Sequence, residues 1–144
     1  MKNNSYNKSD PEEIFYHKLL CFYSKDDIKR QYHSDEYPFN CDFYVISENT
    51  YIEINMSHYH HGHPFNCHDN NDIEELNNIK SKQCLYLNHN NKETKNQYYA
   101  IEDTWTVRDV NKLNPAINNK LNYLMIYPDN LIIYYKNGIL CTQT

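Results

Sequence analysis

Two short runs of alternating residues, 42–46 and 51–55, constrain the fold of this chain more than any other feature. They flank the turn-like residues 47–50, a pattern that predicts a two-stranded β-hairpin. Pairing Ile46 with Tyr51 places Tyr44 opposite Glu53 and Asp42 opposite Asn55. Because side chains alternate between the faces of a strand, the polar residues share one face with Tyr44. The other face is apolar and carries Phe43, Val45, Ile52 and Ile54.

In this register Asp42 and Glu53 are diagonal neighbours, with Cβ atoms roughly 6–8 Å apart. Two carboxylates at that spacing can hold one Mg²⁺, at oxygen distances of about 2.1 Å. The alternative is an ordinary surface hairpin whose polar face meets water, since alternation alone establishes only a strand.

Four histidines follow the hairpin at His58, His60, His61 and His63. Neutral imidazole suits Zn²⁺, and imidazole also serves as an acid or base near neutral pH. The segment could thus be a zinc or nickel site, a source of acid–base groups for a water beside a carboxylate-bound metal, or a His-rich loop without function. Its position directly after Asp42 and Glu53 favours the second interpretation.

Composition limits the classes of protein to consider. The length of 144 residues predicts one domain over residues 10–144, after a mobile lead at residues 1–9. A net charge of −5 counts against DNA as a partner without excluding it, because nucleic-acid binders usually carry a basic footprint. Three small basic groups are candidates for such a footprint: Lys25, Lys29 and Arg30; Lys80 and Lys82; Arg108, Lys112 and Lys120.

The five cysteines are irregularly spaced, with no C-x-x-C, so no disulfide framework is expected. No apolar run approaches about 18 residues, which argues against a membrane span. The polar residues 1–10 have no apolar signal core. A reducing cytoplasm is therefore the expected compartment.

The remaining elements follow from helix and strand signals. Asp10, Pro11, Glu12 and Glu13 form a strong helix start. Helices are expected at residues 10–23, 24–32, 72–82 and 106–120, further strands at 98–104, 121–127 and 131–135, and loops at 58–71 and 88–97. This order predicts an α/β or α+β fold, with a mixed sheet of about four to five strands flanked by helices.

The stretches C-D-F-Y-V, Y-I-E-I-N and H-Y-H-H-G-H-P-F at residues 41–65 carry Asp42, Glu53, His60 and His63 at a characteristic spacing. A second stretch, T-W-T-V-R-D-V-N-K, covers residues 104–112. Together they resemble the very-short-patch repair (Vsr-like) endonucleases, the EDxHD-type homing endonucleases and small phage-encoded nucleases of the PD-(D/E)-x-K class. The resemblance implies a restriction-endonuclease-like core and a Mg²⁺-dependent DNA endonuclease or nickase, with Mn²⁺ as a substitute cation.

The resemblance also implies roles for single residues. Asp42 would be the principal Mg²⁺ ligand, Glu53 the acid of the wider class, and His60 the group that acts on the attacking water or the leaving oxygen. Asp109 would support the site, and Glu12, with Glu13 as a competing choice, would orient a histidine or a metal-bound water. Asn55 stands where that class has lysine or the repair enzymes have histidine. Ser57 and Pro64 replace cysteines of the repair enzymes' structural zinc site, and His63 or His61 would substitute for a missing imidazole.

Three alternatives to a DNA endonuclease stay open. The chain could be a non-catalytic module that binds nucleic acid or protein and retains the fold, or a His-rich protein that binds Zn²⁺. RNA is an alternative substrate, because the same site can hydrolyse either backbone. No separate DNA-binding domain is evident, so high sequence specificity would need a homodimer or a protein partner.

Overall fold

The computed structural model describes residues 10–85 and 92–143, so the lead predicted for residues 1–9 lies outside the described residues. The chain divides into two compact units, which are described separately below. Met1–Met56 and Pro115–Thr144 form the first, called here the sheet unit. Ser57–Asn114 form the second, called the helical unit.

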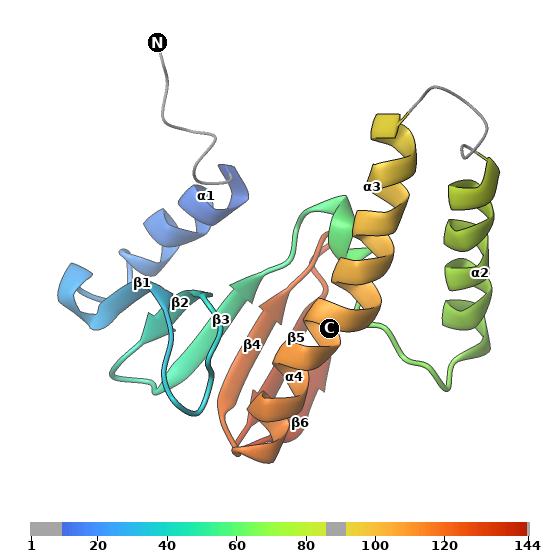
Figure 1. The fold of residues 1–144 in the computed structure, drawn as a ribbon. Coiled ribbons are helices and arrows are strands. Elements are labelled where there is room, and N and C mark those ends of the chain that lie inside the picture. The colour runs from blue at the N-terminus through green and yellow to red at the C-terminus, as the bar shows by residue number, and fades with distance from the viewer. Residues whose placement is uncertain (1–9, 86–91, 144) are drawn as a thin grey trace, which may run out of the picture. The chain divides into compact units, whose positions relative to one another are not determined.

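The sheet unit contains a mixed sheet whose strands lie side by side in chain order (Figure 1). The strands are β1 (Ile28–Tyr32), β2 (Cys41–Val45), β3 (Thr50–Ile54), β4 (Asn122–Ile126), β5 (Ile132–Lys136) and β6 (Ile139–Gln143). The pair β3–β4 is parallel and the other pairs are antiparallel. The predicted α+β class with a mixed sheet is confirmed, and its 6 strands exceed the expected four to five.

Helix α1 (Asp10–Leu19) covers one face of this sheet. It begins as predicted, with acidic residues in its first turn, and ends earlier than expected. Its buried residue Leu19 packs with Phe15 and Tyr16 against the apolar side chains of Ile28, Phe43, Val45 and Ile52. The predicted strand alternation therefore forms this core.

The predicted helix at residues 24–32 is wrong. Only Lys25–Asp27 form a short 3-10 turn, and β1 follows. Ile28 is buried against α1, and Arg30 lies with its guanidinium carbon 4.3 Å from the ring centroid of Tyr16. Ile28 and Arg30 thus share the face towards α1 while Lys29 between them is exposed, which is the alternation of a strand.

The hairpin of β2 and β3 forms with the predicted faces but a different register. Val45 pairs with Thr50 and Phe43 with Ile52, whereas pairing of Ile46 with Tyr51 was predicted. The turn is displaced by one residue towards the N-terminus, so the polar residues keep a common face. Asp27 contributes to this register, because its carboxylate accepts bonds from the backbone N–H (2.8 Å) and hydroxyl (2.5 Å) of Ser47.

The helical unit contains the 3-10 helix η3 (His58–His60), α2 (Asn70–Leu85) and α3 (Lys92–Asp103). A π-helical segment, Thr104–Arg108, joins α3 directly to α4 (Asp109–Asn118). Helix α2 confirms the prediction for 72–82. The predicted strand 98–104 is wrong, and so is the predicted loop 88–97 from residue 92 onward, because both regions are helical. Residues 88–91 of that loop lie outside the described part.

Helices α2 and α3 lie side by side around a small apolar core (Figure 1). Ile79 of α2 packs there with Ile101 and Trp105, whose side chain is fully buried. Trp105, the only tryptophan of the chain, thus has a core role.

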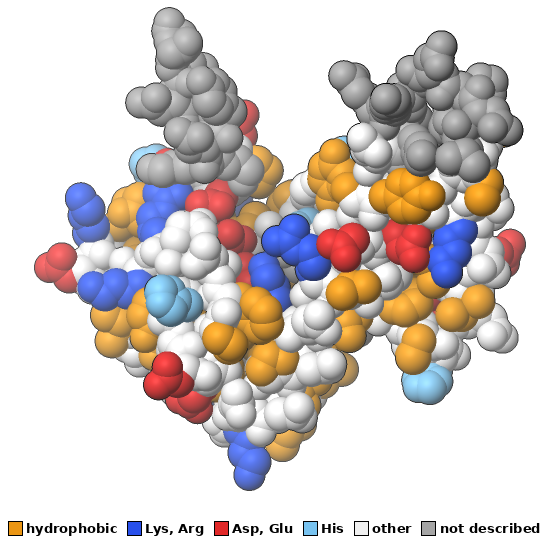
Figure 2. All heavy atoms as spheres, in the orientation of Figure 1, with side chains coloured by type: hydrophobic (Ala, Val, Ile, Leu, Met, Phe, Trp, Pro, Cys, Tyr) orange, Lys and Arg blue, Asp and Glu red, His pale blue; other side chains and the backbone are white. Residues whose placement is uncertain are grey.

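Charged side chains are interspersed on the face drawn in Figure 2, where Lys and Arg lie close to Asp and Glu. Within the described ranges, no helix has both the length and the apolar character needed to cross a lipid bilayer.

Candidate active site

The helical unit brings His60 and Asp109 together. His60 Nδ1 lies 2.8 Å from Asp109 Oδ2, and the two side chains are only 19% and 10% exposed. His60 ends η3, where the Ser57 hydroxyl oxygen accepts the N–H of Tyr59 at 3.2 Å. Asp109 is the first residue of α4, directly after the π-helical segment. Such segments occur frequently at functional sites.

The pairing fixes the chemistry of the imidazole. An ionised carboxylate only accepts hydrogen bonds, so Nδ1 of His60 carries a hydrogen and donates it in the bond to Asp109. Nε2 of the neutral ring then carries a lone pair. An imidazole held in this way can take a proton from water or, once protonated, give one to a leaving group.

A pocket of about 340 Å³ lies in front of this pair. Its polar and charged lining side chains are Ser57, Tyr59, His60, Thr104, Arg108, Asp109 and Lys112. The pocket therefore combines an acid–base pair with two permanent cations.

The other three histidines of the cluster have separate partners. His58 bonds to Gln97 at 2.8 Å, and Nε2 of His61 lies 3.4 Å from a carboxylate oxygen of Glu75. His63 Nε2 lies 2.7 Å from Asp72 Oδ1. In residues 10–85 and 92–143, no three His, Cys, Asp or Glu side chains form a group that could hold a metal ion. The predicted Zn²⁺ site at these histidines stays a prediction.

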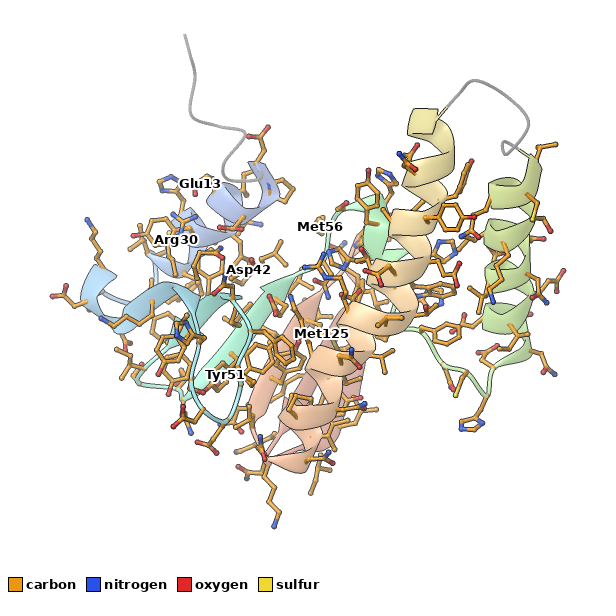
Figure 3. The ribbon with its side chains drawn as sticks, viewed as in Figure 1. Glu13, Arg30, Asp42, Tyr51, Met56 and Met125 are labelled. Atoms are coloured by element: carbon orange, nitrogen blue, oxygen red, sulfur yellow. The ribbon has the colours of Figure 1, made fainter. Side chains whose placement is uncertain are left out.

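The sheet unit brings together the predicted metal ligands Asp42 and Glu53. The N–H of Asp42 donates to Glu53 Oε1 at 3.3 Å, and Asp42 Oδ2 accepts the N–H of Ile54 at 2.7 Å. Each carboxylate is thus bonded to the backbone of the opposite strand. Asp42 is labelled in Figure 3 and lies near the start of β2, the strand that pairs with β3.

Glu53 lies in a buried cluster of phenols that the sequence analysis did not anticipate. The Tyr37 hydroxyl donates to Glu53 Oε2 at 2.5 Å and lies 2.9 Å from the Tyr123 hydroxyl. Burial raises the pKa of Tyr37 far above its ordinary value, and the neighbouring Tyr123 and Glu53 act in the same direction. Burial and Glu53 likewise raise the pKa of Tyr123. Both phenols therefore stay neutral and can donate.

The donor set of Asp42 and Glu53 fits a hard divalent cation. Carboxylate oxygens are the ligands that Mg²⁺ prefers, and Mg²⁺ is commonly held by only one or two carboxylates together with water and substrate phosphate. Glu53 accepts bonds from both Tyr37 and the backbone of Asp42, and a carboxylate has about four lone-pair sites, so lone pairs remain for a cation. A pair of such ligands is thus compatible with the predicted Mg²⁺ or Mn²⁺ site.

The remaining predicted residues are in different surroundings. Glu12 and Glu13 of α1 both form ion pairs with Arg30, at 3.1 Å for Glu12 (Figure 3 labels Glu13 and Arg30). Asn55 is buried after β3, and its N–H donates to the carbonyl of Ile126 at 2.7 Å. The predicted functional roles of Glu12, Glu13 and Asn55 stay predictions.

Sequence reasoning missed two kinds of residue here. Tyr37 was missed because it lies in a region without a strand or helix pattern. Arg108 and Lys112 were noted only as a basic group, although their places beside Asp109 and four residues apart could have assigned them to its pocket.

Comparisons of the chain with protein families, with curated proteins and with solved structures found no significant match.

Proposed function

We propose that this protein is a metal-dependent DNA endonuclease or nickase that hydrolyses phosphodiester bonds. The observation that carries the proposal is the contact of 2.8 Å between His60 and Asp109 in a pocket that also holds Arg108 and Lys112. The mixed sheet with a helix on one face supports the restriction-endonuclease-like core that the resemblance implies.

Asp109 accepts a hydrogen bond from the Nδ1–H of His60 and so holds the ring with Nε2 as the reactive atom. His60 Nε2 then takes a proton from the attacking water or, when protonated, gives one to the leaving oxygen. Asp42 and Glu53 would hold Mg²⁺ or Mn²⁺, which when bound supplies charge stabilisation at the phosphate and activates water. Tyr37 keeps Glu53 in its orientation through the 2.5 Å bond.

The test is cleavage of supercoiled and linear DNA with Mg²⁺ or Mn²⁺, and with EDTA as the metal-free control. Loss of a general acid–base group costs roughly 10²–10⁴-fold in rate, so His60→Ala should slow cleavage by that factor. Asp109→Asn should act in the same direction, because it removes the charge that holds the ring. Asp42→Asn should abolish the dependence on metal together with most of the activity.

His68→Ala is the matched control, since His68 is an exposed histidine of the same unit outside the pocket. It should cleave at the wild-type rate. Absence of cleavage with either metal would contradict the proposal, as would wild-type rates in both His60→Ala and Asp109→Asn.

A second candidate function is supported by the surroundings of Glu53. This carboxylate is only 3% exposed and already accepts bonds from Tyr37 and from the backbone of Asp42, as in a purely structural role. With a net charge of −5, the chain would then be a non-catalytic module that binds nucleic acid or a protein. It would retain its partner equally with EDTA and with Mg²⁺, and would cleave nothing.

The proposal also covers the nucleic acid that is cleaved, the oligomeric state and the cellular compartment. Assays with single-stranded RNA alongside DNA separate the two backbones, and sedimentation with and without DNA detects a homodimer that would supply specificity. The five cysteines are free thiols, which supports the proposed cytoplasmic compartment.

A further inference from the structure

We propose that the pocket in front of His60 binds one backbone phosphate of a nucleic-acid strand through Arg108 and Lys112, without need of a metal. The inference rests on the proposed function, because the same pocket contains the acid–base pair. It goes further in naming the group that is bound and the side chains that bind it.

The charge of the pocket supports an anionic ligand. Its one carboxylate, Asp109, accepts a hydrogen bond from His60, whereas Arg108 and Lys112 are both cationic side chains. No carboxylate in the described part of the chain forms an ion pair with Arg108, which is exposed. Among the side chains that line the pocket, the two cations therefore outnumber the one carboxylate, in a chain whose net charge is −5.

The helix geometry places the two cations on one face. Arg108 is the last residue of the π-helical segment, and Lys112 follows four residues later in α4. Residues four apart are neighbours on a helix surface, with Cβ atoms about 5–6 Å apart. A guanidinium can bind two phosphate oxygens at once, and an ammonium adds a point charge to the same anion.

Hydroxyl groups complete the set of donors. Thr104 lines the pocket, as does Ser57, whose oxygen already accepts the N–H of Tyr59 and whose hydrogen can be donated to a ligand. Hydroxyls beside Arg and Lys are ordinary phosphate contacts in nucleic-acid complexes. The volume of about 340 Å³ exceeds that of a lone phosphate and admits the adjoining sugar, which favours a strand over an inorganic ion.

The experiment measures binding of a fluorescein-labelled single-stranded DNA 12-mer by anisotropy, in EDTA and over a series of salt concentrations. Arg108→Gln and Lys112→Gln should each weaken binding about tenfold. Each should also lower the slope of log K against log salt by about 0.7, the value for one phosphate contact on a single strand. The affinity of Arg108→Lys should lie between those of the wild type and Arg108→Gln, because lysine keeps the charge and loses the two-point contact.

Lys80→Gln is the control for charge alone. Lys80 lies on α2 of the same unit, outside this pocket and 3.9 Å from Glu102, and its loss should leave affinity and slope unchanged. Thermal unfolding of each variant verifies the fold. Wild-type binding by Arg108→Gln and Lys112→Gln, or an equal loss in Lys80→Gln, would overturn the assignment.

Competition separates the sources of phosphate. Inorganic phosphate and thymidine monophosphate should displace the 12-mer only at far higher phosphate concentration than unlabelled DNA; equal potency would overturn the choice of a strand. If DNA binding depends on Arg108 and Lys112 but no cleavage occurs, the proposed function is refuted and this inference stands. If Arg108→Gln and Lys112→Gln cleave DNA at the wild-type rate, this inference is refuted and the proposed function stands.

Discussion

Asp72 is the residue that fixes the loop after η3. Its carboxylate is only 7% exposed and accepts from His63 Nε2 at 2.7 Å and from the N–H of Asn66 at 2.9 Å. Trp105 holds the same loop from another helix, because its Nε1–H donates to the carbonyl of His63 at 2.8 Å. One carboxylate and one indole thus hold the segment that follows His60.

Replacing Asp72 by Asn should therefore destabilise the protein. The amide keeps the shape but loses the charge and one acceptor, and hydrogen bonds to charged groups contribute about 1.5–3 kcal/mol. We expect the free energy of unfolding in urea to fall by about 2 kcal/mol.

The matched control is Asp69→Asn, three residues earlier. Asp69 is exposed, and its carboxylate caps the backbone N–H of Asn71 at 2.8 Å. Asn caps helices about as well as Asp, so this variant should stay close to wild type. Equal losses in both variants would show that the burial of Asp72 is unimportant.

For single residues, the sequence predicted which side chains belong to the candidate site better than it predicted the residues to which they bond. Strand parity correctly placed Asp42 and Glu53 on one face, because that inference needs only local alternation. The residue that bonds to Glu53 could not be predicted, because Tyr37 lies 16 residues away in an irregular segment. The resemblance supplied Asp109 as a site residue, but no local pattern pairs it with His60, 49 residues earlier.

Among the elements, the turn between β5 and β6 depends on one glycine. Asn137 and Gly138 both have positive φ, 54° and 77°, as a two-residue hairpin turn requires. A Cβ added at Gly138 would lie 2.4 Å from the carbonyl oxygen of Ile117, which is too close. The N–H of Gly138 also donates to Leu121 at 2.9 Å.

Gly138→Ala should consequently lower the thermal unfolding temperature strongly. The left-handed conformation alone costs an alanine roughly 1–2 kcal/mol, and the contact with Ile117 adds to it. Gly62→Ala is the control, since Gly62 has φ 79° but no atom within 4 Å of an added Cβ. Gly62→Ala should lower the unfolding temperature only by the cost of the left-handed conformation. A decrease as large as that of Gly138→Ala would refute the steric argument.

Several elements were predictable, and the failures have identifiable causes. The Asn-Gly pair at 137–138 is a strong hairpin signal, and it was overlooked, so β6 was not predicted. Tyr98, Ile101 and Trp105 have helical spacing, but their aromatic and β-branched character suggested a strand. The hairpin register depends on Asp27 bonding to Ser47, 20 residues later, which no local pattern reveals.

At the scale of the molecule, buried phenols make stability dependent on pH. Burial raises the pKa of Tyr37 and of Tyr123 above the ordinary value of about 10. Below that pH both are neutral in the folded and unfolded states, and their contribution is fully present. Above it the unfolded chain releases these protons while the folded protein retains them, so stability falls as pH rises.

We therefore expect the free energy of unfolding to decrease above about pH 10, by up to about 1.4 kcal/mol per pH unit for each buried tyrosine. Tyr37→Phe should be less stable at pH 7, because the bond to Glu53 is lost, and should have a shallower alkaline slope. Urea titrations between pH 7 and 11 measure both quantities. Tyr99→Phe, which removes a hydroxyl from a half-exposed ring, is the comparison, and an equal change of slope there would contradict the assignment.

The sequence predicted the class of the whole fold but not which distant segments pair within the sheet. Strand and helix signals were sufficient for a mixed α+β fold, and residues 121–127 were correctly expected to form a strand, which lies inside the sheet as β4. The parallel pairing of β3 with β4 joins segments separated by the whole helical unit, and no local signal encodes it.

The contact between Tyr37 and Tyr123 spans 86 residues of chain. A ribosome adds about 5–20 residues per second, so a nascent chain waits several seconds between making the first phenol and the second. Until β4 has emerged and docked, Glu53 lacks the neighbouring phenol of Tyr123. The surroundings of this carboxylate are therefore completed only after β4 has been synthesised.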